Sequence, residues 1–220
     1  MNKGILVVVS GFSGAGKGTV MKAFLEKYDN YALSISATTR APREGEMDGR
    51  EYFFKTVEEF EDLIANDDLI EYVKYVKNYY GTPKAYVLEQ LELGKDVILE
   101  IEVQGALKVK EKMPDTPLIF MTPPSAEELR RRLIERGTES MEEIEDRLRT
   151  ANEEAKVMDQ YDYILINDKI EECVDDLHEL IQNEKIQNGK ILNEKHSVSR
   201  NEKFISTIRE ELKVFLKGDK

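Results

Sequence analysis

The stretch "VVVSGFSGAGKGT", residues 7–19, carries the strongest local signal in the sequence. Its run of β-branched residues breaks into three glycines, Gly11, Gly14 and Gly16, and Lys17 follows the last of them. This spacing fits G-x-x-x-x-G-K, the pattern of a loop whose backbone N–H groups surround a phosphate while the lysine adds a positive charge. A glycine-rich turn without a ligand is the alternative. The segments on either side favour the phosphate loop.

Strands and helices alternate along most of the chain. Residues 5–10 are continuously apolar, which predicts a strand covered on both faces, and residues 16–28 predict a helix. Further segments predict strands at 96–103, 117–122 and 161–168, and a helix at 170–182. A strand, a glycine loop and a helix in this order form the context that a phosphate loop requires. The alternation predicts an α/β fold, a parallel β-sheet core flanked by helices.

Net charge, cysteine content and the length of the apolar runs exclude several classes of protein. The 220 residues carry a net charge of −12, which argues against a general nucleic-acid binder. The single cysteine, Cys173, excludes an internal disulfide and favours a reducing compartment. The apolar run near the N-terminus is too short for a secretory signal, and no segment approaches the ~20 apolar residues of a membrane span. We expect a soluble, cytoplasmic protein that binds neither nucleic acid nor membrane.

Two segments interrupt the predicted core. Residues 33–88 mix short strands with a helix that opens at Thr56 and Glu59, a capping box, and predict a small α/β lobe. Residues 124–154 predict a helical hairpin. Its two helix starts are marked by the capping boxes Ser125 with Glu128 and Ser140 with Glu143. The core itself is assigned to residues 1–32, 89–123 and 155–182.

The C-terminal segment, residues 183–220, differs in composition from the core. It begins as a polar linker, and a last helix is predicted to open at Ser199 with Glu202. Phe204, Ile208, Leu212 and Phe215 then share one stripe of that helix. An isolated amphipathic helix is marginal in water, so we expect the stripe to dock on the body of the protein or on a second copy of the chain. A mostly disordered terminus is the alternative.

The position after Lys17 departs from the usual phosphate-loop pattern. Gly18 stands where a serine or threonine hydroxyl normally binds Mg²⁺, and Thr19 is the nearest hydroxyl. The ion could be held by water, by Thr19 or by a group from another strand. In the predicted strand 96–103, Glu100 and Glu102 alternate, so we expect both carboxylates on one face. There they require cations or hydrogen-bond donors, unless the strand is a solvated edge.

Arginines form two groups. Arg40 and Arg43 lie in a predicted loop, and Tyr52 and Tyr80 lie in the same lobe. Guanidinium forks and tyrosine hydroxyls suit a phosphate, although ordinary surface charges are the alternative.

The second group belongs to the predicted hairpin. Arg132 and Arg136 are four residues apart on one helix face, and Arg147 lies on the second helix. Three cations on a capped hairpin suit a lid that closes over a transferring phosphate. The alternative is that acidic neighbours such as Glu135 and Glu143 simply pair with them.

Three other residues with potentially reactive side chains, one cysteine and two histidines, are expected to have ordinary roles. Cys173 is predicted to pack within a helix, because nothing in its surroundings indicates a reactive thiol. His178 and His196 lie in no metal-ligand pattern, so a solvated histidine is the better prediction for each.

Taken together, the motifs resemble guanylate kinase over about residues 4–182. The matching segments are "GFSGAGKGT", "SATTRAPREGEMDGREYFF", "LIEY", "NYYGTPK", "ILEIEVQGA", "RLIERGTES", "RL" at 147–148 and "IND" at 166–168, in order and at the expected separations. The resemblance implies a P-loop nucleoside-monophosphate kinase fold with a GMP-binding lobe (33–88) and a lid (124–154). It implies the reaction of ATP with GMP, and with dGMP, in purine nucleotide metabolism, with Mg²⁺.

The resemblance also assigns roles to residues. The GMP phosphate ligands fall on Arg40, Arg43, Tyr52 and Tyr80, and the guanine contacts on Ser36, Glu71, Thr82 and Glu102, with Glu100 beside them. The ATP-binding set comprises Gly11, Phe12, Ser13, Gly14, Ala15, Gly16, Lys17, Gly18, Thr19 and Asn167. The catalytic set comprises Lys17, Arg40, Arg132, Arg136 and Arg147, and the Mg²⁺ candidates are Thr19 and Glu100.

Two departures from the family pattern stand out: Phe12 replaces a common proline, and Glu102 stands where aspartate is usual. A competing hypothesis from another class is a guanylate-kinase-like protein-binding module of a scaffold. Such modules typically lack a working phosphate loop, whereas Lys17 and the glycines are intact here. A kinase for another monophosphate is a further alternative, against which the carboxylates of Glu71 and Glu102 argue.

Overall fold

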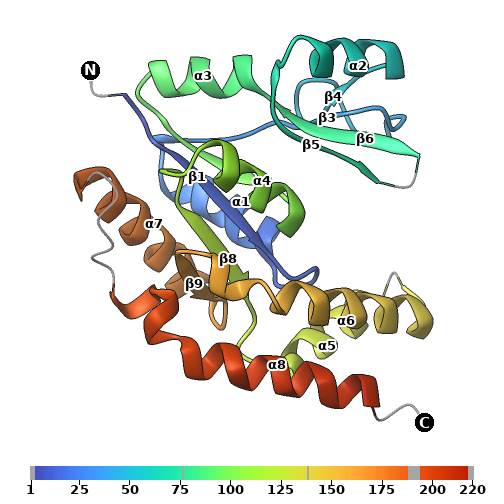
Figure 1. Cartoon of the computed structure of the whole chain (residues 1–220), viewed down its shortest axis with the longest axis vertical. Helices are drawn as coiled ribbons and strands as arrows, with labels where there is room; N and C mark the ends of the chain where they lie inside the picture. The colour runs from blue at the N-terminus through green and yellow to red at the C-terminus, as the bar shows by residue number, and fades with distance from the viewer. Residues whose placement is uncertain (1–2, 76, 138, 188–193, 218–220) are drawn as a thin grey trace. The chain divides into compact units, whose positions relative to one another are not determined.

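The computed structural model describes residues 3–75, 77–137, 139–187 and 194–217 (Figure 1). The chain divides into two compact units. Unit 1 comprises residues 1–7 and 30–116, and unit 2 comprises residues 8–29 and 117–220. Strand β1 (Leu6–Gly11) belongs to both, because the division falls within it.

The parallel sheet has the strand order β2-β7-β1-β8-β9. Unit 1 contributes β2 (Tyr31–Leu33) and β7 (Asp96–Glu100), which pair in parallel, and the Val97 N–H donates to the Ile5 carbonyl at the entry to β1. Unit 2 contributes β8 (Leu118–Thr122) and β9 (Tyr163–Ile166). Strand β8 pairs in parallel with β1 and with β9. Every residue of β1 and β8 is buried, as the continuous apolar runs predict. The predicted α/β fold with a parallel sheet is confirmed.

Unit 1 also holds a four-stranded sheet of order β4-β3-β6-β5. Its strands are β3 (Ala37–Thr38), β4 (Phe53–Phe54), β5 (Leu69–Tyr75) and β6 (Asn78–Pro83), and its helices are α2 (Val57–Ala65), α3 (Lys84–Glu92) and α4 (Val103–Lys112). Ala37, Phe60 and Leu69 form the small core of this lobe. Helix α2 begins at the predicted capping box, in which Thr56 and Glu59 each bond the other's backbone N–H.

The helices of unit 2 are α1 (Lys17–Lys27), α5 (Ala126–Glu135), α6 (Met141–Ala155), α7 (Ile170–Gln187) and α8 (Glu202–Lys217). Single 3₁₀ turns lie at Met158–Gln160, Glu194–His196 and Val198–Arg200. Helices α5 and α6 are the predicted hairpin, and the capping box of Ser140 and Glu143 opens α6. At the start of α5 only half of the predicted box forms: Ser125 accepts the Glu128 N–H, while the Glu128 carboxylate lies elsewhere.

Three element boundaries differ from the sequence predictions. Strand β7 ends at Glu100, and Glu102 is the N-cap of α4, because the chain turns into a helix where a continuing strand was predicted. Glu100 and Glu102 therefore do not alternate along one strand. Helix α7 continues to Gln187, so residues 183–187 are helix and not linker. The last helix begins at Glu202, three residues beyond the predicted start at Ser199, which lies within the 3₁₀ turn Val198–Arg200 that Ser197 caps.

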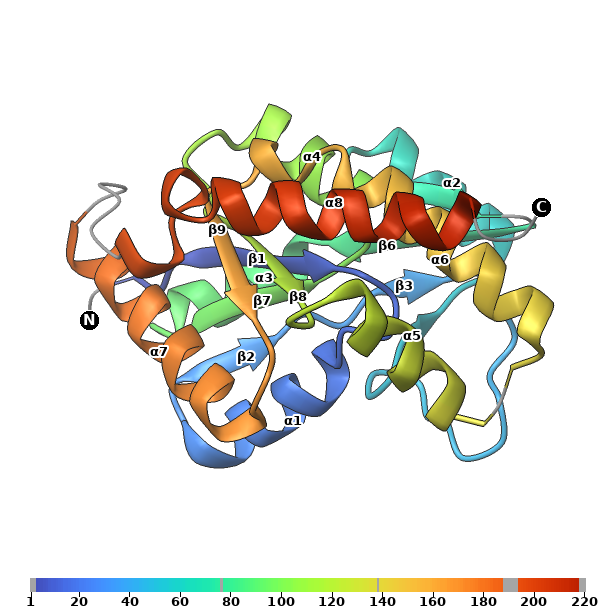
Figure 2. The same cartoon turned by 90° about the horizontal axis from the view of Figure 1, so that it is seen from below.

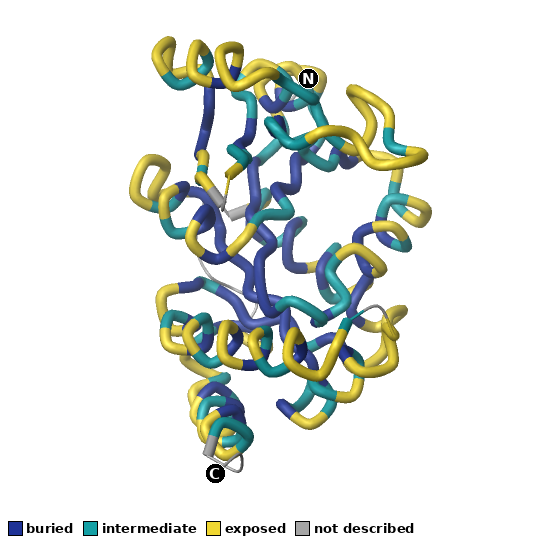
Figure 3. The backbone as a smooth tube through the Cα atoms, turned by 90° about the vertical axis from the view of Figure 1, so that its right-hand side faces the viewer, coloured by how far each residue is buried: buried dark blue, intermediate teal, exposed yellow. Residues whose placement is uncertain are grey.

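The C-terminal helix docks on the body of unit 2. Ile205, Ile208 and Leu212 are at most 3% exposed, and α8 packs against α6 and α5 (Figure 2). Buried and exposed positions alternate around α8 where the tube approaches the C-terminus (Figure 3). A docked helix is confirmed for residues 202–217, and the disordered alternative is wrong for them. Its buried face differs from the predicted stripe, because Ile205 is buried while Phe204 and Phe215 are only half-buried. Residues 188–193 of the predicted linker lie outside the described residues.

Candidate active site

The glycine loop between β1 and α1 has the backbone geometry of an anion cradle. Gly14 and Gly16 have φ of 92° and 89°, values that side-chain-bearing residues rarely adopt. A Cβ on Gly16 would lie 2.6 Å from Asn167 Nδ2, so the position also needs a glycine for space. Gly16 is the N-cap of α1 and brings no side-chain acceptor to the helix start. The first N–H groups of α1, at the positive end of the helix dipole, can therefore serve an anionic ligand.

Lys17 lies over this loop. Its Nζ donates to the carbonyl oxygens of Gly11, at 2.7 Å, and Phe12, at 3.2 Å. Of the ion pairs that the described residues make, none involves Lys17, so its charge is held near the loop without a neutralising carboxylate. Gly18 needs no glycine for packing, since a Cβ there would meet nothing within 4 Å. Thr19, the nearest hydroxyl, is exposed on the first turn of α1.

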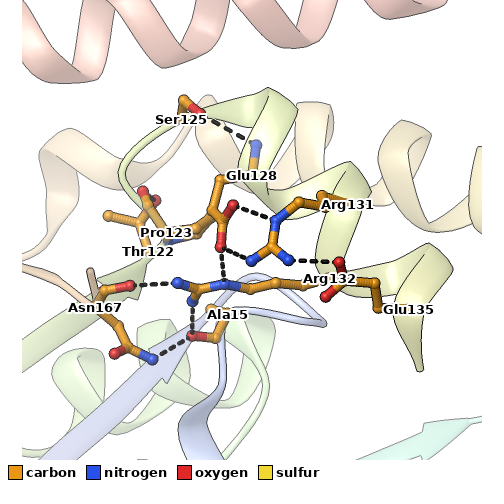
Figure 4. Close-up of polar contacts among 9 residues, drawn as sticks. All are labelled: Ala15, Thr122, Pro123, Ser125, Glu128, Arg131, Arg132, Glu135 and Asn167. Atoms are coloured by element: carbon orange, nitrogen blue, oxygen red, sulfur yellow. Dashed lines mark hydrogen bonds and ion pairs between the residues drawn. The ribbon is translucent and has the colours of Figure 1, made fainter. Parts of the chain in front are cut away.

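Arg132 of α5 joins the hairpin to the loop (Figure 4). Its guanidinium donates to the Ala15 carbonyl, at 3.2 Å, and to the Asn167 carbonyl, at 2.9 Å. The Asn167 side-chain amide donates to the same Ala15 oxygen at 2.8 Å. The structure thus brings together three predicted site residues from the loop, α5 and the end of β9.

Glu128 holds Arg132 in this position, and the sequence analysis assigned it only to a helix cap. Its carboxylate accepts from Arg132 Nε at 2.7 Å and from two nitrogens of Arg131 at 2.6 and 2.7 Å. The hydrogen bonds from Arg131, with those from Arg132, hold the pKa of Glu128 at about 2, well below its usual range. The spacing of four residues between Glu128 and Arg132 was the available signal for the pair.

The other two hairpin arginines differ in their surroundings. Arg147 of α6 donates to the Ser13 hydroxyl in the loop and pairs with Glu139 at 2.5 Å. Arg136 is the C-cap of α5; its side chain is 58% exposed and lies 3.9 Å from the same carboxylate.

The alternative that acidic neighbours pair with these arginines holds for Arg132 and Arg147, which pair with Glu128 and Glu139, but the two examples named for it are wrong. Glu135 pairs with Arg131, and Glu143 closes the capping box of α6. The loop therefore gathers Arg132 and Arg147, while Arg136 stays at the exposed end of α5.

Unit 1 holds the predicted phosphate ligands of the lobe. The guanidinium of Arg40 lies 5.3 Å from the centre of the Tyr52 ring, and the Tyr52 and Tyr80 rings pack edge to face at 6.2 Å. Arg40 also forms a two-pronged ion pair with Glu46, at 2.9 Å for each bond, which lowers the pKa of that carboxyl. Arg43 is exposed in the same loop, and its backbone N–H donates to Glu46.

A buried carboxylate lies on the neighbouring strands of the lobe. Glu71 of β5 is 4% exposed and accepts the Thr82 hydroxyl of β6 at 2.9 Å. Burial raises the pKa of Glu71. A Cβ on Gly105 of α4 would come within 2.9 Å of its second oxygen, so the glycine makes room for this side chain. Of the remaining predicted residues, half-buried Ser36 precedes β3, half-buried Glu100 ends β7, and exposed Glu102 caps α4.

His196 is buried, which corrects the sequence prediction of a solvated histidine, whereas His178 is half-buried. His196 is 6% exposed, with Nδ1 at 3.3 Å from the Ile164 carbonyl and Nε2 at 3.4 Å from Asp176. His178 stacks on the Tyr28 ring, with the ring centres 3.9 Å apart. The residues that contact the two histidines are distant in sequence, so no local sequence pattern predicts these contacts. Cys173 packs in the core as predicted, and burial raises the pKa of its thiol to about 12.

A parallel α/β sheet, a glycine loop with its lysine and two arginines directed at that loop define a P-loop kinase, a transferase of phosphoryl groups. Comparison with known proteins identifies the family. Residues 3–184 match the family model described as guanylate kinase, and the chain belongs to that family.

Curated relatives and a solved structure agree with this family. The guanylate kinase of Caldanaerobacter subterraneus subsp. tengcongensis is 50% identical over 209 residues, covering 95% of this chain and 97% of the relative. That of Lactococcus lactis is 50% identical over 190 residues, covering 86% and 93% of the two chains. The crystal structure of guanylate kinase from Anaplasma phagocytophilum superposes with a TM-score of 0.67 at 33% identity, covering 88% of this chain and 93% of that one.

Among the described residues, no helix has the length and apolar character that a membrane crossing requires.

Proposed function

We propose that this chain transfers the γ-phosphoryl group of ATP to GMP, and to dGMP, with the donor bound by unit 2 and the acceptor by unit 1. The observation that carries the proposal is the distribution of side chains. The glycine loop, Lys17, Arg132, Arg147 and Asn167 belong to unit 2. Arg40, Arg43, Tyr52, Glu71, Tyr80 and Thr82 belong to unit 1.

On the donor side, the chain's residues bind and neutralise the polyphosphate. The loop amides and the start of α1 hold the phosphates, and the Lys17 ammonium leaves the Gly11 and Phe12 carbonyls to reach them. Arg132 and Arg147 already bond to loop atoms, which supports a role in stabilising charge on the transferring group. No side chain has to act as a covalent nucleophile, because the GMP phosphate oxygen attacks the γ-phosphorus directly.

On the acceptor side, Arg40, Arg43 and the two tyrosines bind the GMP phosphate. Arg40 would share its guanidinium between that phosphate and Glu46. Guanine offers donors at N1 and N2 and an acceptor at O6, so the Glu71 carboxylate suits the donors and hydroxyls such as Thr82 suit O6. Adenine lacks those donors and would leave a buried carboxylate unpaired. Sites of this kind discriminate by roughly 10⁴-fold.

The residues also fit Mg²⁺. Mg²⁺ binds through one or two protein oxygen ligands plus substrate phosphates, and each unit offers one candidate ligand, the Thr19 hydroxyl in unit 2 and the Glu100 carboxylate in unit 1. The described residues contain no cluster of three or more His, Cys, Asp or Glu side chains that could hold a metal, which suits an ion held mainly by phosphates. When bound, Mg²⁺ would neutralise phosphate charge.

The cysteine content supports a cellular location. The one buried thiol, Cys173, supports a reducing, cytoplasmic location.

A coupled assay with ATP and each of GMP, dGMP, AMP, CMP and UMP tests the proposal. GMP and dGMP should be phosphorylated, and the other three should be poor acceptors. A protein-binding module would bind without turnover, so inactivity toward every acceptor would contradict the proposal.

The matched variants for this assay are Lys17→Ala and Lys22→Ala. Both lysines lie on α1, but Lys22 is exposed away from the loop contacts. Lys17→Ala should lower turnover by at least ~10²-fold, the scale of one lost transition-state donor, without unfolding the chain. Lys22→Ala should behave like the parent. Near-normal turnover in Lys17→Ala would overturn the phosphate-loop assignment.

A further inference from the structure

Helix α8 contacts the N-terminal end of α5 through a charged side chain. The N–H of Ala126, the first residue of α5, donates to the Glu211 carboxylate at 2.8 Å. This N–H is one of the four that a helix start leaves without intrahelical partners. A carboxylate there also faces the positive end of the α5 dipole. Glu211 thus supplements the local cap, Ser125, from a position 85 residues away.

Helix α8 also contacts the C-terminal end of α6, through Arg209. Arg209 donates to the carbonyls of Ala155, at 2.7 Å, and Lys156, at 3.0 Å, and pairs with Asp159 at 3.1 Å. Ala155 is the last residue of α6 and Lys156 its C-cap. A cation at this end faces the negative pole of the helix dipole. One turn of α8 therefore holds both ends of the hairpin that connect to the sheet.

Apolar packing fixes that turn in place. Ile208 and Leu212 flank Arg209 and Glu211 in sequence and are 1% and 0% exposed. Helix α8 packs against both α5 and α6. The two charged contacts are thus presented by a helix that is itself anchored in the fold.

Both hairpin helices carry an arginine that bonds to the phosphate loop. Arg132 lies six residues beyond Ala126 on α5, about 9 Å along the helix, and reaches Ala15. Arg147 lies on α6 and reaches Ser13. A rotation or shift of either helix at its held end would move its guanidinium relative to the loop.

We propose that Glu211 and Arg209 are positioning residues for phosphoryl transfer, acting through α5 and α6 on Arg132 and Arg147. The proposal rests on the roles proposed above for those two arginines. It gives the C-terminal helix, which lies beyond the family match ending at residue 184, a part in the reaction. The 50% identical Caldanaerobacter relative, aligned over 95% of this chain, must include part of the same segment.

The test is steady-state kinetics on Glu211→Ala and Arg209→Ala, with Glu210→Ala as the matched control. Glu210 is a neighbour on α8 whose ion pair is with Lys213, on the same exposed surface. Each of the two test variants should lower kcat by roughly 10- to 100-fold, the effect of a displacement of about 1 Å, with little change in KM for GMP. Assays are run well below each variant's melting temperature.

Conservative variants separate positioning from general stability. Glu211→Gln keeps an oxygen acceptor for the Ala126 N–H and should restore most of kcat. Arg209→Lys keeps the charge but loses the planar fork whose Nε and Nη2 reach the two carbonyls. It should therefore show a lowered kcat as well, and it replaces Arg209→Ala if that variant does not fold. A lowered melting temperature with unchanged kcat would overturn the proposal.

The variants Arg132→Lys and Arg147→Lys test separately the proposal on which this one rests, that Arg132 and Arg147 themselves act in phosphoryl transfer. If both retain full turnover, the proposed roles of the arginines are wrong. If they lose turnover while the Glu211 and Arg209 variants keep it, only the positioning proposal is wrong.

Discussion

At the scale of single residues, three arginines of the proposed phosphate sites each pair with a glutamate. Arg40 pairs with Glu46, Arg132 with Glu128, and Arg147 with Glu139. Each of these carboxylates holds a long, flexible cation in one orientation before any phosphate arrives. The side chains of Arg132 and Glu128 are 19% and 21% exposed, so this pair is less screened by solvent than a surface pair.

The stability of Glu128→Gln relative to the parent, measured as a function of pH, tests the contribution of the Glu128 charge to this pair. The pKa of Glu128 is about 2 in the folded chain against an ordinary 4.5, so the carboxylate stabilises the fold above pH 4.5 and loses this effect as the pH falls toward 2. The variant should therefore be less stable than the parent at pH 7, and the difference should shrink between pH 4.5 and 2. Urea unfolding across this range measures it. Glu127→Gln, an exposed position in the same helical turn, is the control. A difference that does not vary with pH would contradict the assignment.

Arg43→Ala tests the phosphate ligands of the lobe. Loss of one charged hydrogen bond is worth about 1.5–3 kcal/mol, so KM for GMP should rise by roughly 10- to 100-fold while KM for ATP changes little. Arg50→Ala removes another exposed arginine of the same loop, one that pairs with Glu51, and should leave both KM values near the parent's. Initial-rate measurements with each substrate varied in turn decide the outcome. An effect confined to ATP would mean that the lobe is misassigned.

At the scale of elements, the docking of α8 depends on a narrow apolar face. Leu212 is fully buried in that face, whereas Val214, two residues on, is 67% exposed. A comparison of alanine substitutions at these two positions therefore distinguishes the loss of buried packing from an effect on the helix itself.

Leu212→Ala should destabilise the chain by about 2–5 kcal/mol, the usual cost of emptying a buried leucine site. Val214→Ala should change the stability by no more than ~0.5 kcal/mol. Denaturant unfolding followed by far-UV circular dichroism compares the two. Equal effects would show that α8 does not dock through this face.

At the scale of the whole molecule, the proposed binding groups divide between the two units. The donor group lies within residues 8–29 and 117–220, and the acceptor group within residues 30–116. A variant in one unit should therefore impair one ligand and spare the other.

Ligand-induced stabilisation measures this division without turnover. A ligand at 100 times its Kd stabilises the fold by about 2.7 kcal/mol. At 100 times the parent's Kd, GMP should raise the melting temperature of Lys17→Ala clearly more than that of Arg43→Ala, and ATP should do the reverse. If one substitution abolishes stabilisation by both ligands, the proposed division of substrates is wrong.

The local parts of this protein were predictable because their signals are short in sequence. The glycine loop follows from the spacing of Gly11, Gly16 and Lys17, and two helix starts follow from the capping boxes at Thr56 and Ser140. Continuous apolar runs predicted the buried parallel strands. In each case the interacting atoms lie within a few residues of one another, so the pattern of residue types specifies the contact.

Contacts between distant segments required the tertiary structure. Glu102 leaves the predicted strand because α4 begins directly after it. His196 contacts Ile164 of β9, 32 residues earlier, and Asp176 of α7, 20 residues earlier. Arg132 donates a hydrogen bond to Ala15, 117 residues earlier, and Glu211 accepts one from Ala126, 85 residues earlier. Residue types alone cannot select such partners, because any acidic or basic side chain within reach would satisfy the same charge. Only the packing of helices on the sheet determines which groups come within hydrogen-bonding distance.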